Sequence, residues 1–101
     1  MRRMYIDGKF VESEAGETFP VDNPATEEHL DDVPRARSAD AEQAVRAAVR
    51  AQDEWRFVPG IEKCELLHGV AHKLREHQRA LAALLTQEGG KPLIETAPVT
   101  P

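Results

Sequence analysis

The sequence has little of what several common protein classes need. It contains a single cysteine, Cys64, so an internal disulfide is impossible, and this fits the reducing cytoplasm, where we expect the protein to lie. It has no apolar run that approaches the ~20 residues of a membrane-spanning helix. Arg2 and Arg3 are not followed by the apolar stretch of a signal peptide. We therefore expect no membrane association.

Basic residues and large apolar residues are also scarce. The chain of 101 residues has 13 Lys and Arg against 18 Asp and Glu, a net charge of −5. Nucleic-acid binding needs a basic surface that neutralises phosphates, so we expect no nucleic-acid partner. Alanine supplies much of the 41% hydrophobic fraction, and because alanine buries little surface, the core that this chain can build alone is thin.

Residues 1–37 carry the signals of strands and turns. Asp7-Gly8 between two short runs of strand-forming residues predicts a hairpin with a type I′ turn, in which both turn residues have positive φ. Pro20 confines its strand to the edge of a sheet, because proline has no N–H to donate. The predicted extended pieces are residues 4–6, 9–11, 18–21 and 29–34, with a turn at residues 23–26.

Residues 38–93 change to a spacing typical of amphipathic helices. We predict three helices, at about residues 38–55, 61–77 and 79–88, with Ser38 as the first N-cap and Gly89 as the C′ residue of the third. Residues 94–101 form a tail without pattern, which we predict to be disordered; all three segments belong to one incomplete domain. The expected inner faces are Ala41, Ala44, Val45, Ala48, Ala51 and Trp55 in the first helix, Cys64, Leu67, Val70, Ala71 and Leu74 in the second, and Leu81, Leu84 and Leu85 in the third.

Cys64 is the only thiol and therefore the only candidate for a cysteine nucleophile. A reactive thiolate needs an electropositive and partly exposed site. Cys64 is in register with Leu67 and Ala71 on the apolar face of its helix. We therefore interpret it as a packing residue, without a general base beside it, and Trp55 likewise as a core anchor at the end of the first helix.

Two further groups have a chemical and a structural interpretation. Glu65, His68, His72 and Glu76 lie along one helix face, where two histidines four residues apart can chelate a metal ion. The zinc-protease pattern is absent, so a solvated face is the favoured interpretation. Residues 88–91, Glu-Gly-Gly-Lys, follow a helix instead of preceding one, so they favour a helix C-cap over a phosphate-binding loop.

The order of these features resembles a known family. The matching residues are Tyr5-Ile6-Asp7-Gly8-Lys9-Phe10-Val11, Asn23-Pro24-Ala25-Thr26, Val33-Pro34-Arg35-Ala36, Trp55, Pro59, Glu62, Leu66-Leu67, and the run from Leu84 to Leu93 with Glu88-Gly89-Gly90-Lys91-Pro92. Together they are similar to the N-terminal segment of the NAD(P)-dependent aldehyde dehydrogenase superfamily. The resemblance implies an α/β enzyme, of which this chain is an incomplete piece: a β-hairpin and short strands followed by three helices. Glu27 stands where the family usually has Gly, and Gly89 where it usually has Thr.

The resemblance also implies the function of the complete enzyme. These enzymes oxidise an aldehyde to a carboxylate through a thioester on a cysteine, with a glutamate base and hydride transfer to NAD or NADP. The family's catalytic and nucleotide-binding residues lie beyond the segment that matches. We therefore predict no catalytic, cofactor-binding or metal-binding residue in this chain, and no activity of the chain alone.

Two other hypotheses stay open at this point. One is that the chain is a small helical interaction module. The other is that it is one part of a split dehydrogenase. In each case, apolar helix faces left uncovered predict self-association or docking on a complementary dehydrogenase chain.

Overall fold

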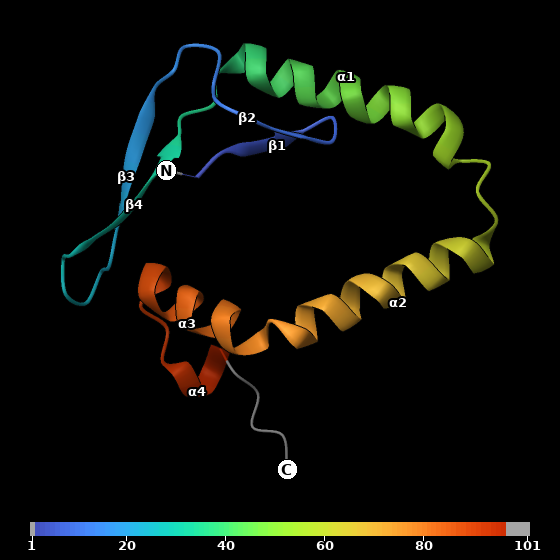
Figure 1. The fold of residues 1–101 in the computed structure, drawn as a ribbon. Helices are drawn as coiled ribbons and strands as arrows, with labels where there is room; N and C mark the ends of the chain where they lie inside the picture. The colour runs from blue at the N-terminus through green and yellow to red at the C-terminus, as the bar shows by residue number, and fades with distance from the viewer. Residues whose placement is uncertain (1, 97–101) are drawn as a thin grey trace. The chain divides into compact units, whose positions relative to one another are not determined.

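The computed structural model describes residues 2–96, in which strands precede helices as the sequence predicts (Figure 1). This confirms the expected order of a hairpin, short strands and then helices. The elements are β1 (Met4–Ile6), β2 (Lys9–Val11), β3 (Thr18–Asp22), β4 (His29–Pro34), α1 (Ser38–Trp55), α2 (Gly60–Glu76), α3 (Gln78–Gly89) and α4 (Leu93–Thr96). No helix in residues 2–96 is both long and apolar enough to cross a membrane.

The first two strands form the predicted hairpin. β1 and β2 pair antiparallel with Tyr5 opposite Phe10, and the two turn residues have positive φ, 54° at Asp7 and 74° at Gly8. Asp7-Gly8 suits this turn because both residues tolerate the left-handed region. The Tyr5 and Phe10 rings meet edge to face, with their centroids 5.1 Å apart.

β3 and β4 form a second two-stranded sheet, and the predicted turn at residues 23–26 joins them. Asn23 closes this turn: its Oδ1 accepts hydrogen bonds from the N–H groups of Ala25, at 2.9 Å, and Thr26, at 3.3 Å. The N–H of Glu27 donates to the Asn23 carbonyl at 2.7 Å, and Glu27 takes a left-handed φ of 63°. The position where the family resemblance leads us to expect Gly therefore has the backbone conformation that Gly adopts most readily.

The start of α1 differs from the prediction in its cap. Arg37 is the N-cap and Ser38 is the first helical residue, so the prediction that Ser38 caps the helix is wrong. The acceptor comes instead from Asp40, whose Oδ2 accepts the Arg37 N–H at 2.9 Å. An acidic side chain at the third helical position reaches back to the cap residue in this way and also lies at the positive end of the helix.

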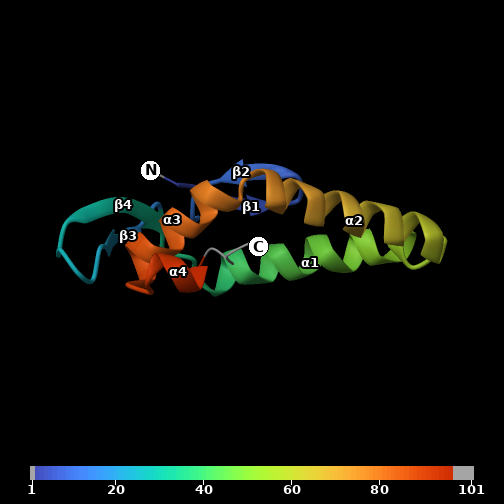
Figure 2. The same cartoon turned by 90° about the horizontal axis from the view of Figure 1, so that it is seen from below.

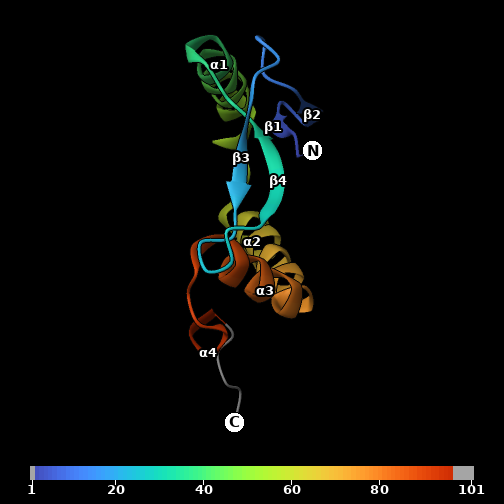
Figure 3. The same ribbon diagram turned by 90° about the vertical axis from the view of Figure 1, so that its left-hand side faces the viewer.

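α1 contacts β1 through a face that matches the predicted one only in part (Figure 3). Ala47 of α1 and Ile6 of the hairpin are both buried, with exposed fractions of 9%. Val45 of the predicted inner face has an exposed fraction of 62%. The prediction of that face was therefore correct in part, since Ala44 is half-buried, and wrong for Val45. The buried residues of α1, Asp40 and Ala47, lie on the same helix face as Ala44, and Val45 lies beside that face.

The hairpin and α1 belong to the same compact unit. The hairpin packs on α1, and an ion pair joins Arg50 Nη2 of α1 to Asp7 Oδ2 of the hairpin turn at 3.4 Å. Two compact units result, one formed by Met1–Val21 with Asp31–Val58 and the other by Asp22–Leu30 with Pro59–Pro101. Residues 22–30 belong to the same unit as the later helices, although α1 separates them in the sequence.

The helices of the second unit follow the predicted bounds within one or two residues (Figure 2). α3 ends with Gly90 in the left-handed conformation, φ 73°, whose N–H donates to the Thr86 carbonyl at 3.0 Å. The C-cap prediction is thus confirmed, but at Gly90 instead of Gly89, which is the last helical residue. Residues 93–96 form α4, so the first part of the predicted tail is helical, and the remainder of that tail lies outside the described residues.

The short helix α4 is ordered by two threonines. Thr86 Oγ1 of α3 and Thr96 Oγ1 of α4 lie 3.1 Å apart, and Thr96 Oγ1 donates to the Leu93 carbonyl at 3.0 Å. The prediction that the tail begins at residue 94 missed this pair, because a hydrogen bond between residues ten positions apart has no local sequence pattern.

Candidate functional site

Cys64 is exposed on α2, not packed, so the structure contradicts our interpretation of it as a core residue. Its Sγ lies 3.9 Å from Nε2 of His68, one helical turn away. A nucleophilic cysteine needs its imidazole oriented by a third group and needs donors for an oxyanion. Among residues 2–96, His68 makes no further hydrogen bond, so the thiol and the imidazole meet without the rest of a catalytic site.

The four possible metal ligands on α2 do not come together. His72 Nε2 lies 3.0 Å from Oε1 of Glu76, whose Oε2 also accepts from Lys73 Nζ at 3.0 Å. His68 is engaged with Cys64 instead. Within the described residues, no three His, Cys, Asp or Glu side chains are placed to hold one metal ion. The favoured interpretation, a solvated face with local ion pairs, agrees with this geometry.

Residues 88–91 form the end of a helix. The Gly90 N–H is used by the Thr86 carbonyl, and Lys91 Nζ lies 3.9 Å from Oε2 of Glu95. Amide groups that bind phosphate converge at the beginning of a helix, where they are free. The geometry agrees with the interpretation of these residues as a helix cap.

Trp55 does not anchor a core in this chain. Its exposed fraction is 40%, and the next aromatic residue, Phe57, is 73% exposed. Our interpretation of Trp55 as a core residue is wrong for the described residues, because α1 turns Ala47, and not its C-terminal end, toward the hairpin.

The sequence missed the polar cluster that is best buried. Asp40 and Ser13 are exposed to only 4% and 5%. Asp40 Oδ1 accepts the N–H of Glu14 at 2.9 Å, in addition to the Arg37 N–H on Oδ2, and Ser13 Oγ donates to the Glu17 carbonyl at 3.1 Å. An acidic residue at the third position of a helix was the available signal, but its second partner is 26 residues away and has no local pattern.

Charged pairs surround this cluster. Arg37 Nη2 binds Oε2 of Glu17, and this hydrogen bond, followed by the charge of Arg37, holds the pKa of the Glu17 carboxyl below its usual range. The Arg35 guanidinium lies over the Phe19 ring, 5.9 Å from its centroid. An open hollow lies here, and the residues that line it are Phe19, Arg35, Ala36 and Arg37. Arg37 is already paired with Glu17, so its guanidinium is not free to bind a ligand in this hollow.

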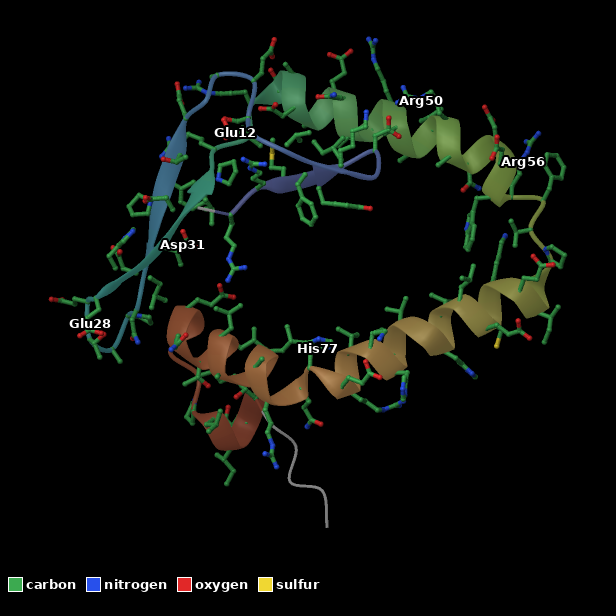
Figure 4. The ribbon with its side chains drawn as sticks, viewed as in Figure 1. Glu12, Glu28, Asp31, Arg50, Arg56 and His77 are labelled. Atoms are coloured by element: carbon green, nitrogen blue, oxygen red, sulfur yellow. The ribbon has the colours of Figure 1, made fainter. Side chains whose placement is uncertain are left out.

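Two more ion pairs tie the N-terminal residues to nearby strands. Arg2 Nε lies 3.4 Å from Oδ2 of Asp31, and Arg3 Nη2 lies 3.9 Å from Oε1 of Glu12. Figure 4 labels Asp31 and Glu12 on their segments, with Arg50 on α1. The hydrogen bond from the Asp32 N–H holds the pKa of Asp31 below its usual range. These exposed pairs set local geometry and add little stability.

Comparison with known proteins decides the family. Residues 10–98 match the model of the aldehyde dehydrogenase family. The chain belongs to the aldehyde dehydrogenase family. It is 43% identical, over 97 residues, to a putative aldehyde dehydrogenase DhaS of Bacillus subtilis, a match that covers 94% of this chain and 20% of that protein.

Solved structures of aldehyde dehydrogenases share the fold of this chain. A betaine aldehyde dehydrogenase from Staphylococcus aureus in complex with NAD+ matches with a TM-score of 0.92 and 36% identity, over 95% of this chain and 20% of that one. An NADP dependent enzyme of E. coli matches with a TM-score of 0.93 and 34% identity, over the same 95% and 20%. The chain thus spans about a fifth of the length of the relatives it matches and corresponds to their N-terminal part. This confirms the resemblance seen in the sequence.

Proposed function

We propose that this chain is the N-terminal structural part of an NAD(P)-dependent aldehyde dehydrogenase, which oxidises an aldehyde to a carboxylate in the cytoplasm, and that the chain alone does not catalyse this reaction. The observation that carries the proposal is the family match over residues 10–98 together with coverage of only about a fifth of each relative. The chemistry that the family resemblance implies then belongs to the other four fifths.

The geometry of Cys64 supports the part of the proposal that concerns activity. Its imidazole neighbour, His68, lies 3.9 Å away and makes no other hydrogen bond among residues 2–96. A thiol without an oriented base and without oxyanion donors is a poor nucleophile for a carbonyl carbon. The complete enzyme would use NAD or NADP as its hydride acceptor; the related S. aureus enzyme in complex with NAD+ and the NADP dependent enzyme of E. coli support this.

The exposed apolar side chains support a docking role. α2 has no buried residue, although Leu66, Leu67 and Val70 are 56%, 64% and 56% exposed. Apolar surface of this extent in a monomer marks an interaction site. We propose that the remainder of the dehydrogenase, on the same or a separate chain, covers these helices, and that in its absence the chain self-associates. The alternative is a helical interaction module with an unrelated partner.

A kinetic assay tests the absence of activity. The purified chain is incubated with a panel of aldehydes and with NAD or NADP, and reduced cofactor is followed by absorbance. We expect the same background rate for the chain and for Cys64→Ser, and no saturable binding of NAD or NADP in a calorimetric titration. Turnover that Cys64→Ser abolishes, or cofactor binding in the low micromolar range, would contradict the proposal.

A complementation assay tests the docking role. The B. subtilis relative is produced without the segment that matches this chain, and activity and mass are measured for each component and for the mixture. We expect a stable complex by light scattering and a gain of activity only in the mixture. If this chain and the shortened relative do not form a complex, but this chain binds a protein that is not a dehydrogenase, the interaction-module alternative is supported instead.

A further inference from the structure

The loop between β3 and β4 belongs to the same compact unit as α2, α3 and α4, although α1 separates them in the sequence. One close contact within this unit joins Pro24 to Gly90. A Cβ added at Gly90 would lie 3.0 Å from Cγ and 3.9 Å from Cβ of Pro24, so the proline ring rests on the glycine backbone. Around the other glycines of the chain, a Cβ would meet nothing within 4 Å.

We propose that Pro24 and Gly90 form a conformational latch, which holds the loop of residues 23–28 on the C-terminal end of α3 and thereby directs the chain from α3 into α4. The latch joins two sequence motifs, the turn Asn23-Pro24-Ala25-Thr26 and the helix end Gly89-Gly90-Lys91-Pro92. It acts within one unit and depends on no group outside residues 2–96.

The loop side of the latch is rigid. Asn23 Oδ1 binds two N–H groups of the turn, and the Asn23 N–H donates to the Glu28 carbonyl at 2.9 Å, so both ends of the loop are closed on Asn23. Proline at the next position has a fixed φ and few conformations to lose. The Pro24 ring is therefore held ready for contact before the loop meets α3.

The helix side of the latch requires glycine for two separate reasons. Gly90 has a φ of 73°, a conformation that costs residues with a Cβ free energy. A side chain at this position would also press on Pro24. Beyond Gly90, the N–H of Glu95 donates to the Pro92 carbonyl at 2.9 Å, and Thr96 meets Thr86, so the direction taken at residue 90 decides where α4 packs.

Asparagine separates the two requirements, because it tolerates the left-handed conformation but carries a Cβ. In Gly90→Asn we expect the amides of residues 23–28 to exchange with solvent about tenfold faster, equivalent to about 1.4 kcal/mol. The matched control is Gly89→Asn, since the last helical residue lacks a positive φ and a Cβ there meets nothing within 4 Å. In the control we expect a change of at most about twofold.

A second variant keeps the test independent of folding. Pro24→Ala removes the ring atom that lies nearest to Gly90, so Gly90→Asn should have little further effect on exchange when it is added to Pro24→Ala. Hydrogen-bonded amides of α2, in the same unit but away from the latch in the sequence, report unfolding of that unit and should not change. In the unsubstituted chain, a nuclear Overhauser contact between the Pro24 ring and the Gly90 Hα should be present.

Three results would overturn the latch. One is equal exchange rates in Gly89→Asn and Gly90→Asn. Another is additivity of Gly90→Asn with Pro24→Ala. The third is the absence of the Overhauser contact in the unsubstituted chain while the hydrogen-bonded amides of α3 are protected.

Discussion

The two compact units of the chain hold their elements in different ways. The unit with the hairpin and α1 contains the buried polar residues Ser13 and Asp40 and a small apolar contact between Ile6 and Ala47. In the other unit, α2 has no buried residue, and in the described part of the chain beyond residue 47 the only buried residue is Ala82, exposed to 2%. The first unit therefore has a small buried contact of polar and apolar residues, although Val45 and Phe57 of the same unit are exposed, whereas α2 of the second unit leaves all of its apolar side chains outside a core.

The largest effect should come from breaking the packing of α1 on the hairpin. Ala47→Asp places a carboxylate against the hairpin, where Ala47 is buried, and should lower the free energy of unfolding by about 2–3 kcal/mol. Ala48→Asp is the matched control on the neighbouring, exposed face and should change it by less than about 0.5 kcal/mol. Urea unfolding followed by circular dichroism measures both. Equal destabilisation by the two substitutions would restore the originally predicted inner face.

The polar anchor of the same unit should give the next effect. Asp40→Ala leaves the N–H groups of Arg37 and Glu14 without their acceptor and should cost about 2 kcal/mol. The control is Asp53→Ala, an exposed acidic residue later in α1, for which we expect a change within about 0.5 kcal/mol. If the urea midpoints of the two variants coincide, Asp40 does not anchor the segment around Glu14 to α1.

A stabilising substitution is expected in the other unit. Glu27→Gly relieves the left-handed φ of 63° and, after the added entropy of glycine in the unfolded chain, should stabilise by about 0.5–1 kcal/mol. Glu28→Gly, at a residue without a positive φ, should be neutral or destabilising. Thermal melts rank the two variants. A lower melting temperature for Glu27→Gly than for the original chain would show that the turn carries no strain.

The smallest effect concerns pH. The pKa of Glu17 is lowered by its hydrogen bond and ion pair with Arg37, so the stabilisation that it gives is present above the unfolded pKa and is lost as the pH falls through the lower, folded pKa. The pKa can be measured by nuclear magnetic resonance of the Glu17 carboxyl carbon. Arg37→Gln should raise the midpoint toward the ordinary value for glutamate. An unchanged midpoint would mean that the pair does not persist in solution.

Local features were predictable where the signal lies within a few residues. Asp7-Gly8 requires positive φ at both positions and so predicts its own turn, and Asn23 closes its turn with an adjacent side chain. The helices and the strand at His29–Pro34 followed from periodicity and flanking prolines. The cap residues were displaced by one position, to Arg37 and Gly90, because neighbouring residues compete for the same role and the final choice depends on the acceptor that each reaches.

The candidate site was less predictable, because the exposure of a side chain depends on which other elements pack against it. Cys64 and Trp55 have the sequence pattern of buried residues but lie exposed. Their pattern records an apolar face and says nothing of what covers it. The chain matches only about a fifth of each relative, and packing within the described residues leaves both side chains exposed.

The sequence by itself determined the order of the elements, the turn at Asp7-Gly8 and the membership of the aldehyde dehydrogenase family, because each depends on residue type and spacing along the chain. Only the tertiary structure decided that Ala47 faces the hairpin, that Asp40 binds the Glu14 N–H, and that the Pro24 ring rests on Gly90. Helical periodicity identifies more than one apolar stripe on α1, and choosing between them requires the position of a partner. Contacts between residues far apart depend on close approach in space, which local patterns do not encode.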